Sequence, residues 1–130
     1  VFDAVDDNRN PVYHTNVLMC IATDFVMICL DMIPDSARRL EIEERFTRSG
    51  RQIIALSIKQ IKNFAGNALE LQSNKGLVLA LSNVALKALD PKQKAIIEQS
   101  TIILPLDIPT IELAGGSVRC MLAGVHLSPR

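Results

Sequence analysis

The sequence has no tryptophan and few other aromatic residues: one tyrosine and four phenylalanines, or 4% of 130 residues. Its core must therefore be largely aliphatic, and the 48% hydrophobic content is ample for one modest domain. Fourteen basic residues balance fourteen acidic ones, so the sequence lacks the basic surplus that usually accompanies binding to nucleic acid or an anionic membrane. These absences favour a small molecule or another protein as the partner.

Long apolar segments and the pattern of a secretory leader are also missing. The longest apolar stretch, Phe25 to Leu30, is too short to span a bilayer, and the first residues lack a basic start followed by an apolar run. Three cysteines cannot all pair in disulfides, and Cys20 and Cys29 lie in apolar runs that suit reduced thiols. We therefore expect a cytoplasmic protein.

The spacings typical of common cofactor and metal sites do not occur. Gly115 and Gly116 are not followed by the spaced lysine of a phosphate-binding loop. The sequence also contains no CxxC pair and no HExxH helix. It predicts no metal site and no cofactor.

Short segments of similar character recur about every fifty residues, and each is predicted to begin a hairpin. Each segment combines small, polar and apolar residues: Thr15–Leu18, Gly66–Leu69 and Gly116–Arg119. A helix, a single strand and a short helix are predicted between successive hairpins, with Pro34-Asp35-Ser36 and Asp90-Pro91 as the start signals of two of these helices. A fixed period of this size is typical of a repeat architecture, often closed radially as in a propeller. The predicted hairpins pair Val12–Ala22 with Phe25–Leu30, Asn67–Leu71 with Leu77–Leu81, and Ser117–Leu122 with Val125–Leu127.

Cys120 is the main candidate for chemistry. It follows two glycines and comes directly after Arg119. Glycines let the backbone approach a ligand closely, and a nearby guanidinium favours the thiolate over the thiol. His14 is one of two histidines, and a cysteine nucleophile needs a proton carrier that titrates near neutral pH. The alternative interpretations are a buried strand cysteine and a core histidine.

Three motifs in this order resemble the guanidino-modifying superfamily: His-Thr-Asn-Val at 14–17, Phe-Ala-Gly-Asn-Ala-Leu-Glu at 64–70, and Ala-Gly-Gly-Ser-Val-Arg-Cys-Met at 114–121. This superfamily includes arginine deiminases, amidinotransferases and dimethylarginine hydrolases, built as five-bladed α/β propellers. The sequence is most similar to its citrulline hydrolases. The resemblance covers essentially the whole chain and implies an α/β repeat fold. Residues 1–130 would form the C-terminal two to two-and-a-half blades of a larger propeller domain, with further blades upstream.

The resemblance implies that Cys120 is the nucleophile and His14 the general acid/base. The thiolate would attack the central carbon of a guanidino or ureido group, and His14 would protonate the departing nitrogen. His14 would then deprotonate the water that frees the covalent intermediate.

Asn16 bears on the choice of substrate, because arginine deiminases carry an aspartate two positions after the histidine. A neutral ureido group needs no buried counter-charge, and an amide can donate to it and accept from it. Asn16 therefore favours citrulline over arginine. Asn67, Gly115 and Gly116 complete the candidate substrate site, although asparagine and glycine also suit turns and strand starts.

The sequence thus predicts a cysteine hydrolase that cleaves the ureido C–N bond of citrulline or a related compound. Arginine deiminase, amidinotransferase and dimethylarginine hydrolase chemistry are the alternatives among enzymes. A further alternative is an inactive fragment that serves only as an association module, because an incomplete ring leaves apolar blade edges exposed. The expected partners are a ureido or guanidino substrate and a complementary chain or a second copy.

Overall fold

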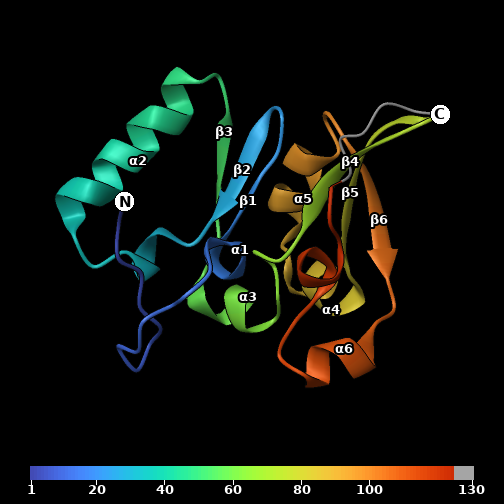
Figure 1. Cartoon of the computed structure of the whole chain (residues 1–130). Helices are drawn as coiled ribbons and strands as arrows, with labels where there is room; N and C mark the ends of the chain where they lie inside the picture. Colours follow the sequence, from blue (N-terminus) through green and yellow to red (C-terminus); the bar gives the residue numbers. More distant parts are fainter. Residues whose placement is uncertain (125–130) are drawn as a thin grey trace.

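The computed structural model describes residues 1–124, and two three-stranded sheets with the same arrangement lie at its centre (Figure 1). In each sheet the first two strands are antiparallel and the third is parallel to the middle one. The first sheet consists of β1 (Met19–Ile21), β2 (Phe25–Ile28) and β3 (Gln52–Ala55), and the second of β4 (Leu69–Ser73), β5 (Gly76–Ser82) and β6 (Ile102–Leu106).

Short helices connect these strands, and α2 lies along the outer side of the first sheet (Figure 1). The α-helices are α1 (Thr15–Leu18), α2 (Ser36–Arg48), α3 (Ile58–Lys62), α4 (Asn83–Ala88), α5 (Pro91–Ile97) and α6 (Pro109–Leu113). Two 3₁₀ helices, η1 (Leu30–Met32) and η2 (Val118–Met121), complete the described elements. No helix in residues 1–124 is long and apolar enough to cross a membrane.

Several helix starts follow from the sequence. The carboxylate of Asp35 accepts hydrogen bonds from the backbone N–H groups of Ala37 and Arg38, which begins α2 where a helix was predicted. Ser57 begins α3 and Asp90 begins α5, each with a glutamine three positions on that completes a capping box. These side chains satisfy backbone donors that the first helical turn leaves without partners.

The core is aliphatic, as the composition requires. All four residues of β2 are buried, because this strand lies between β1 and β3. Leu79 and Leu81 of β5 are fully buried in the second sheet. Cys20 and Cys29 are free and buried, and burial raises the pKa of the Cys20 thiol to about 12. These two cysteines therefore serve as core residues.

The prediction of a five-bladed propeller is wrong. Residues 1–124 form two separate three-stranded sheets, and no closed ring of strands exists in this part of the chain. The repetition in the sequence specifies a local topology twice, since turn residues and apolar runs recur in the same order. Local repetition does not specify how units are placed around an axis.

The first predicted hairpin is shorter than expected. Within the predicted strand 12–22, only Met19–Ile21 pairs with β2, and α1 precedes it. The N–H of Val17 donates to the carbonyl of His14 at 3.1 Å, which closes a helical turn in place of a strand. An apolar run of this length does not distinguish a strand from a buried helical turn.

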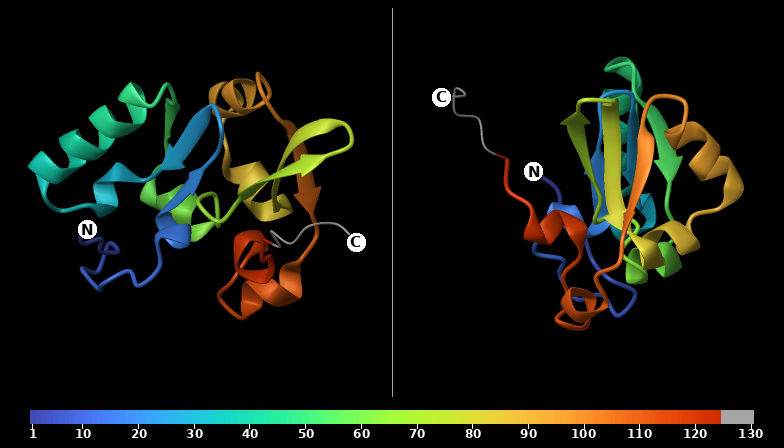
Figure 2. Two further views of the ribbon diagram at one scale, coloured as in Figure 1. Left: turned by 45° about the horizontal axis from the view of Figure 1, so that its top comes forward. Right: turned by 90° about the vertical axis from the view of Figure 1, so that its right-hand side faces the viewer.

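The predicted strand 117–122 is instead the 3₁₀ helix η2. The N–H of Cys120 donates to the carbonyl of Ser117 at 3.1 Å and to the side-chain oxygen of Asn67 at 3.3 Å. These contacts replace the backbone hydrogen bonds between strands that a hairpin would have formed. The predicted partner, 125–127, lies outside the described residues. Figure 2 shows η2, in red, at one end of the sheets, near the blue segment that contains α1.

Candidate active site

The thiol of Cys120 is held by a buried amide. The Nδ2 atom of Asn67 donates to Cys120 Sγ at 3.1 Å, while Asn67 Oδ1 accepts from the backbone N–H of Cys120. The side chain of Asn67 comes from the turn before β4 and is 4% exposed, whereas Cys120 is exposed. The arrangement fixes a sulfur atom that solvent and ligands can reach.

Asn16 joins this cluster from α1. Its Nδ2 atom lies 3.7 Å from Cys120 Sγ, and its backbone carbonyl accepts from Asn67 Nδ2 at 3.0 Å. Its side-chain oxygen, Oδ1, is buried and has no hydrogen-bond partner within residues 1–124. An unpaired buried acceptor costs about 1 to 3 kcal/mol, so an N–H group bound there would remove a penalty.

A second buried oxygen without a partner in the described part of the chain is Oε2 of Glu70. The other oxygen of this carboxylate accepts from the backbone N–H of Thr23 at 2.9 Å and from its hydroxyl at 2.6 Å. This contact links the first sheet's hairpin to β4. Glu70 therefore serves as a connection between the two sheets.

The two predicted glycines act through the backbone. Gly115 has φ +88°, a left-handed conformation that favours glycine. A Cβ atom at Gly116 would lie 3.3 Å from Cys120 Cβ and 3.8 Å from Sγ, which is close packing against the thiol. Gly115 also lines the same cavity as Cys120. The structure thus brings Cys120, Asn67 and both glycines together.

This cavity has a volume of about 440 Å³, within the range of small-molecule sites. Apolar side chains such as Val17 and Phe64 form much of its wall, with Asn67 and Cys120 beside them. The wall also contains three residues of the N-terminal loop and one lysine: Asp6, Asp7, Asn8 and Lys62.

The loop at residues 6–10 is not recognisable from the sequence as part of a site, because consecutive aspartates and asparagines resemble an ordinary turn. The carboxylate of Asp6 accepts from the backbone N–H groups of Asn8 and Asn10, at 2.9 and 2.7 Å. The side chain of Asn10 also donates to Asp6, and these hydrogen bonds lower the pKa of the Asp6 carboxyl. Lys62 forms an ion pair with Asp7 and so fastens the loop to α3.

His14 lies outside the hydrogen-bonded cluster. It is the exposed residue directly before α1, two positions from Asn16. Within residues 1–124, its imidazole forms no hydrogen bond to Cys120 or to another side chain. The charge of the Arg119 guanidinium acts on the buried Cys20, where it partly offsets the effect of burial on the pKa of that thiol.

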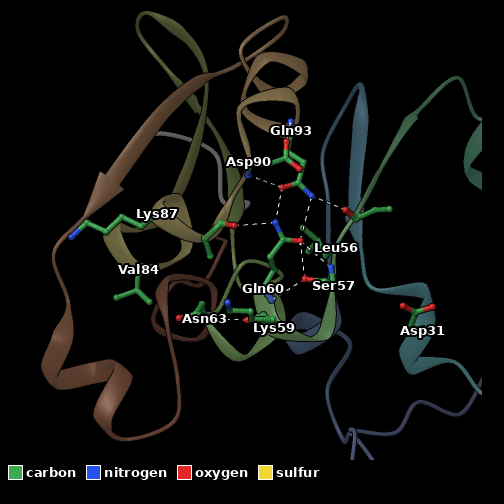
Figure 3. Close-up of a pocket in the computed structure, with 12 residues that line it drawn as sticks. Asp31, Leu56, Ser57, Lys59, Gln60, Asn63, Val84, Lys87, Asp90 and Gln93 are labelled. Atoms are coloured by element: carbon green, nitrogen blue, oxygen red, sulfur yellow. Dashed lines mark hydrogen bonds between the residues drawn. The ribbon is translucent and has the colours of Figure 1, made fainter.

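A larger cavity of about 920 Å³ lies between the two repeats, and Cys120 is not part of its lining (Figure 3). Gln60 and Gln93 point toward one another across it, and Gln60 Nε2 donates to Gln93 Oε1 at 2.7 Å. Gln93 Nε2 donates to the carbonyl of Ala55 at 2.7 Å, and Gln60 Nε2 donates to the carbonyl of Ala88 at 3.0 Å. Because these amides already bond to protein groups, we interpret this region as a structural joint.

Metal ligands do not gather anywhere in residues 1–124: no three histidine, cysteine, aspartate or glutamate side chains lie close enough to hold an ion. The polar groups that form hydrogen bonds with Cys120 are the amide side chains of Asn16 and Asn67 and the backbone carbonyl of Ser117.

The chain belongs to the eukaryotic N,N-dimethylarginine dimethylhydrolase family, since residues 1–127 match that family. This match confirms the resemblance to the guanidino-modifying superfamily. Comparison with curated protein sequences gives no match.

Solved structures with a similar fold include ArgZ, an arginine dihydrolase of the ornithine-ammonia cycle in cyanobacteria, with a TM-score of 0.66 and 16% identity. That match covers 90% of this chain and 17% of ArgZ. AgrE in a ternary complex with ornithine and NAD⁺ matches with a TM-score of 0.66 and 20% identity, over 90% of this chain and 15% of AgrE.

A variant of the ArgZ N-terminal domain, covalently bound to a reaction intermediate, matches with a TM-score of 0.63 and 18% identity. The match covers 90% of this chain and 38% of that domain. The chain therefore spans well under half of each of these structures. At these identities the likeness shows the fold alone.

Proposed function

We propose that the protein is a cysteine hydrolase that cleaves a C–N bond of a guanidino or ureido compound. The observation that carries this proposal is the exposed Cys120 thiol, held at 3.1 Å by Asn67 on the wall of a ligand-sized cavity. The family supports the same class of chemistry, because its name describes hydrolysis of dimethylarginine. ArgZ, of similar fold, is an arginine dihydrolase, and its domain has been captured with a covalent reaction intermediate.

In the first step, the Cys120 thiolate attacks the central carbon of the substrate and forms a C–S bond. The tetrahedral species then collapses, the C–N bond breaks, and the departing nitrogen takes a proton from His14. In the second step, His14 removes a proton from water, and the resulting oxygen nucleophile attacks the same carbon. The C–S bond breaks, and the thiolate and the product are released.

His14 is proposed for the proton transfers because of its position beside Asn16. Its exposed imidazole, two residues before an asparagine that lies 3.7 Å from Cys120 Sγ, is placed at the start of the segment that borders the thiol. Imidazole titrates near neutral pH and can therefore both give and accept a proton in one cycle.

The substrate we propose is citrulline or a related ureido compound. The Asn16 side chain is neutral, has a donor near the thiol, and has an unpaired acceptor in Oδ1. A ureido group offers both a carbonyl oxygen and N–H groups, so it can satisfy both ends of this amide. A guanidinium in the same place would bring a full charge, and within residues 1–124 no carboxylate forms a hydrogen bond with Asn16.

The alternative substrate is a guanidino compound such as arginine or dimethylarginine. Two observations favour it: the family to which the chain belongs, and the Asp6 carboxylate on the wall of the cavity. Asp7 adds little to that argument, because Lys62 pairs with it.

Steady-state kcat/KM for citrulline, arginine and N,N-dimethylarginine on the intact protein tests the proposal. We expect hydrolysis of citrulline to be fastest, Cys120→Ser to lower turnover by orders of magnitude, and Asn16→Asp to damage citrulline turnover. Cys29→Ser is the matched control for the serine exchange, since Cys29 is buried in the core. Full turnover by Cys120→Ser would refute the proposed nucleophile. A preference for a guanidino compound that Asn16→Asp leaves unchanged would refute the proposed substrate.

Three further predictions from the sequence stay predictions: a C-terminal place of this chain in a larger domain, association with a complementary chain or a second copy, and a cytoplasmic location. The coverage of only 38% of the ArgZ N-terminal domain supports a larger domain, whereas the C-terminal place within it rests on the sequence motifs alone.

A further inference from the structure

We propose that Asn67 does not bind substrate but positions Cys120 and stabilises its thiolate, through a side chain whose hydrogen-bonding groups are all used inside the protein. The inference rests on the proposed function in that Cys120 is the nucleophile. It assigns to Asn67 a role different from the substrate contact that the sequence predicts.

Every hydrogen-bonding group of the Asn67 side chain has a partner within the protein. A side-chain amide offers two N–H donors and one carbonyl acceptor. The Nδ2 atom of Asn67 lies 3.0 Å from the carbonyl oxygen of Asn16 and 3.1 Å from Cys120 Sγ, so both donors have partners. Asn67 Oδ1 accepts from the backbone N–H of Cys120 at 3.3 Å. With this side chain 4% exposed, no donor is free for a ligand.

The backbone of Asn67 is engaged as well. Its N–H donates to the carbonyl of Phe64 at 2.8 Å, and its carbonyl accepts from the N–H of Arg119 at 3.3 Å. One residue therefore connects three parts of the chain that are distant in sequence: the segment with Asn16, the turn at 64–67, and η2. Removing its side chain would loosen the attachment of η2, and with it the position of the sulfur.

The turn that delivers Asn67 has little freedom. Phe64 adopts φ +62°, in the left-handed region, and a Cβ atom at Gly66 would lie 2.5 Å from the carbonyl oxygen of Val17. Only glycine permits this approach, because a contact of 2.5 Å with a backbone atom cannot be relieved by a rotamer change. The turn is thus packed directly against α1, which sets the distance between Asn67 and Asn16.

The Asn67–Sγ contact also affects the charge on sulfur. A hydrogen bond donated to an ionised group favours the ionised form, and bonds to charged groups are stronger than those between neutral ones. Asn16 Nδ2 provides a second, longer contact at 3.7 Å. At the buried Cys20, by contrast, burial dominates and raises the pKa of the thiol to about 12. The donors at Cys120 point to a site arranged for a thiolate.

The test is the alkylation rate of Cys120 across a range of pH in the intact protein, measured with iodoacetamide and read on the peptide that contains Cys120 by mass spectrometry. We expect Asn67→Asp to slow labelling of Cys120 at pH 7 by about tenfold or more and to shift the rise of the labelling rate to higher pH. The reason is that the variant loses both N–H donors and adds a negative charge. Asn63→Asp is the matched control. Within residues 1–124 the Nδ2 atom of Asn63 donates only to the carbonyl of Lys59, so labelling of Cys120 in this variant should follow the wild-type pH profile. If Asn67→Asp is unfolded by circular dichroism, Asn67→Ser replaces it, with the same expected direction.

Alkylation of Cys120 at the wild-type rate in a folded Asn67 variant would overturn the inference. A rise in KM with unchanged kcat and unchanged labelling would also overturn it, since that pattern defines a substrate contact. Labelling does not depend on turnover. Slow labelling in Asn67→Asp, together with no hydrolysis by the wild type, would therefore retain the inference and refute the proposed function.

Discussion

Two regions of the molecule are built around pairs of amide side chains, and they differ in one respect. At the joint between the repeats, Gln60 and Gln93 bond to each other and to backbone groups. At the cluster around Cys120, Asn67 is equally saturated, but Asn16 keeps an unpaired buried oxygen beside an exposed thiol. Complete pairing stabilises a protein, whereas an unpaired group next to an exposed thiol provides a place for a ligand.

The largest expected effect sets the cluster around Cys120 apart from the core, and it is the reactivity of the three thiols. We expect iodoacetamide at pH 7 to label Cys120 at least a hundredfold faster than Cys20, because the thiolate is the reactive form. Burial raises the pKa of Cys20 to about 12, so its thiolate fraction stays small until the pH approaches that value. Burial also raises the pKa of Cys29.

Mass spectrometry of labelled peptides measures these rates. The labelling rates of Cys20 and Cys29 should keep rising with pH into the alkaline range. Equal labelling of all three thiols in the folded protein would contradict the assignment of Cys120 as the exposed, reactive one.

The next largest effect is expected at Gly66, in the cluster. Gly66→Ala should destabilise the protein by about 2 to 3 kcal/mol, because the new Cβ would meet the carbonyl oxygen of Val17 at 2.5 Å. It should also slow labelling of Cys120, since the turn positions Asn67. Urea denaturation measures the free energy of unfolding. Gly50→Asn is the control, because asparagine tolerates the left-handed conformation of Gly50 and a Cβ there meets nothing within 4 Å. Equal stability of Gly66→Ala and the wild type would show that the turn can move.

A smaller effect is expected at the joint. Gln93→Ala should lower the free energy of unfolding by about 1 to 2 kcal/mol, because the carbonyl of Ala55 and the N–H of Asp90 lose their partner. Labelling of Cys120 should not change, since Gln93 belongs to the structural region. Gln72→Ala, at an exposed position in β4, is the matched control for stability. Slower labelling in Gln93→Ala would show that the two regions are coupled.

Local signals in the sequence predicted several elements correctly. The Asp35 cap of α2, the Asp90-Pro91 start of α5 and the hairpin of β4 and β5 all depend on residues close together in the chain. Capping and turn formation are short-range effects, so they can be read from neighbouring residues. The motifs also selected Asn16, Asn67 and Cys120, which the structure brings together.

Long-range contacts decided the rest. An alternating segment at 117–122 predicts a strand, but η2 forms because Asn67, more than fifty positions earlier, accepts from the N–H of Cys120. The loop at 6–10 joins the cavity through the ion pair between Asp7 and Lys62, for which its own sequence contains no signal.

The sequence by itself determined an aliphatic core, two units with one strand topology, and the residue types of the candidate site. Composition and turn residues act locally, and they carry that information directly. Only the tertiary structure decided that the two N–H donors of the Asn67 side chain bond to Asn16 and Cys120. It also decided that Asn16 Oδ1 has no hydrogen-bond partner within residues 1–124. The roles of two asparagines of identical chemistry differ because hydrogen bonds depend on the distances between distant segments, which packing alone sets.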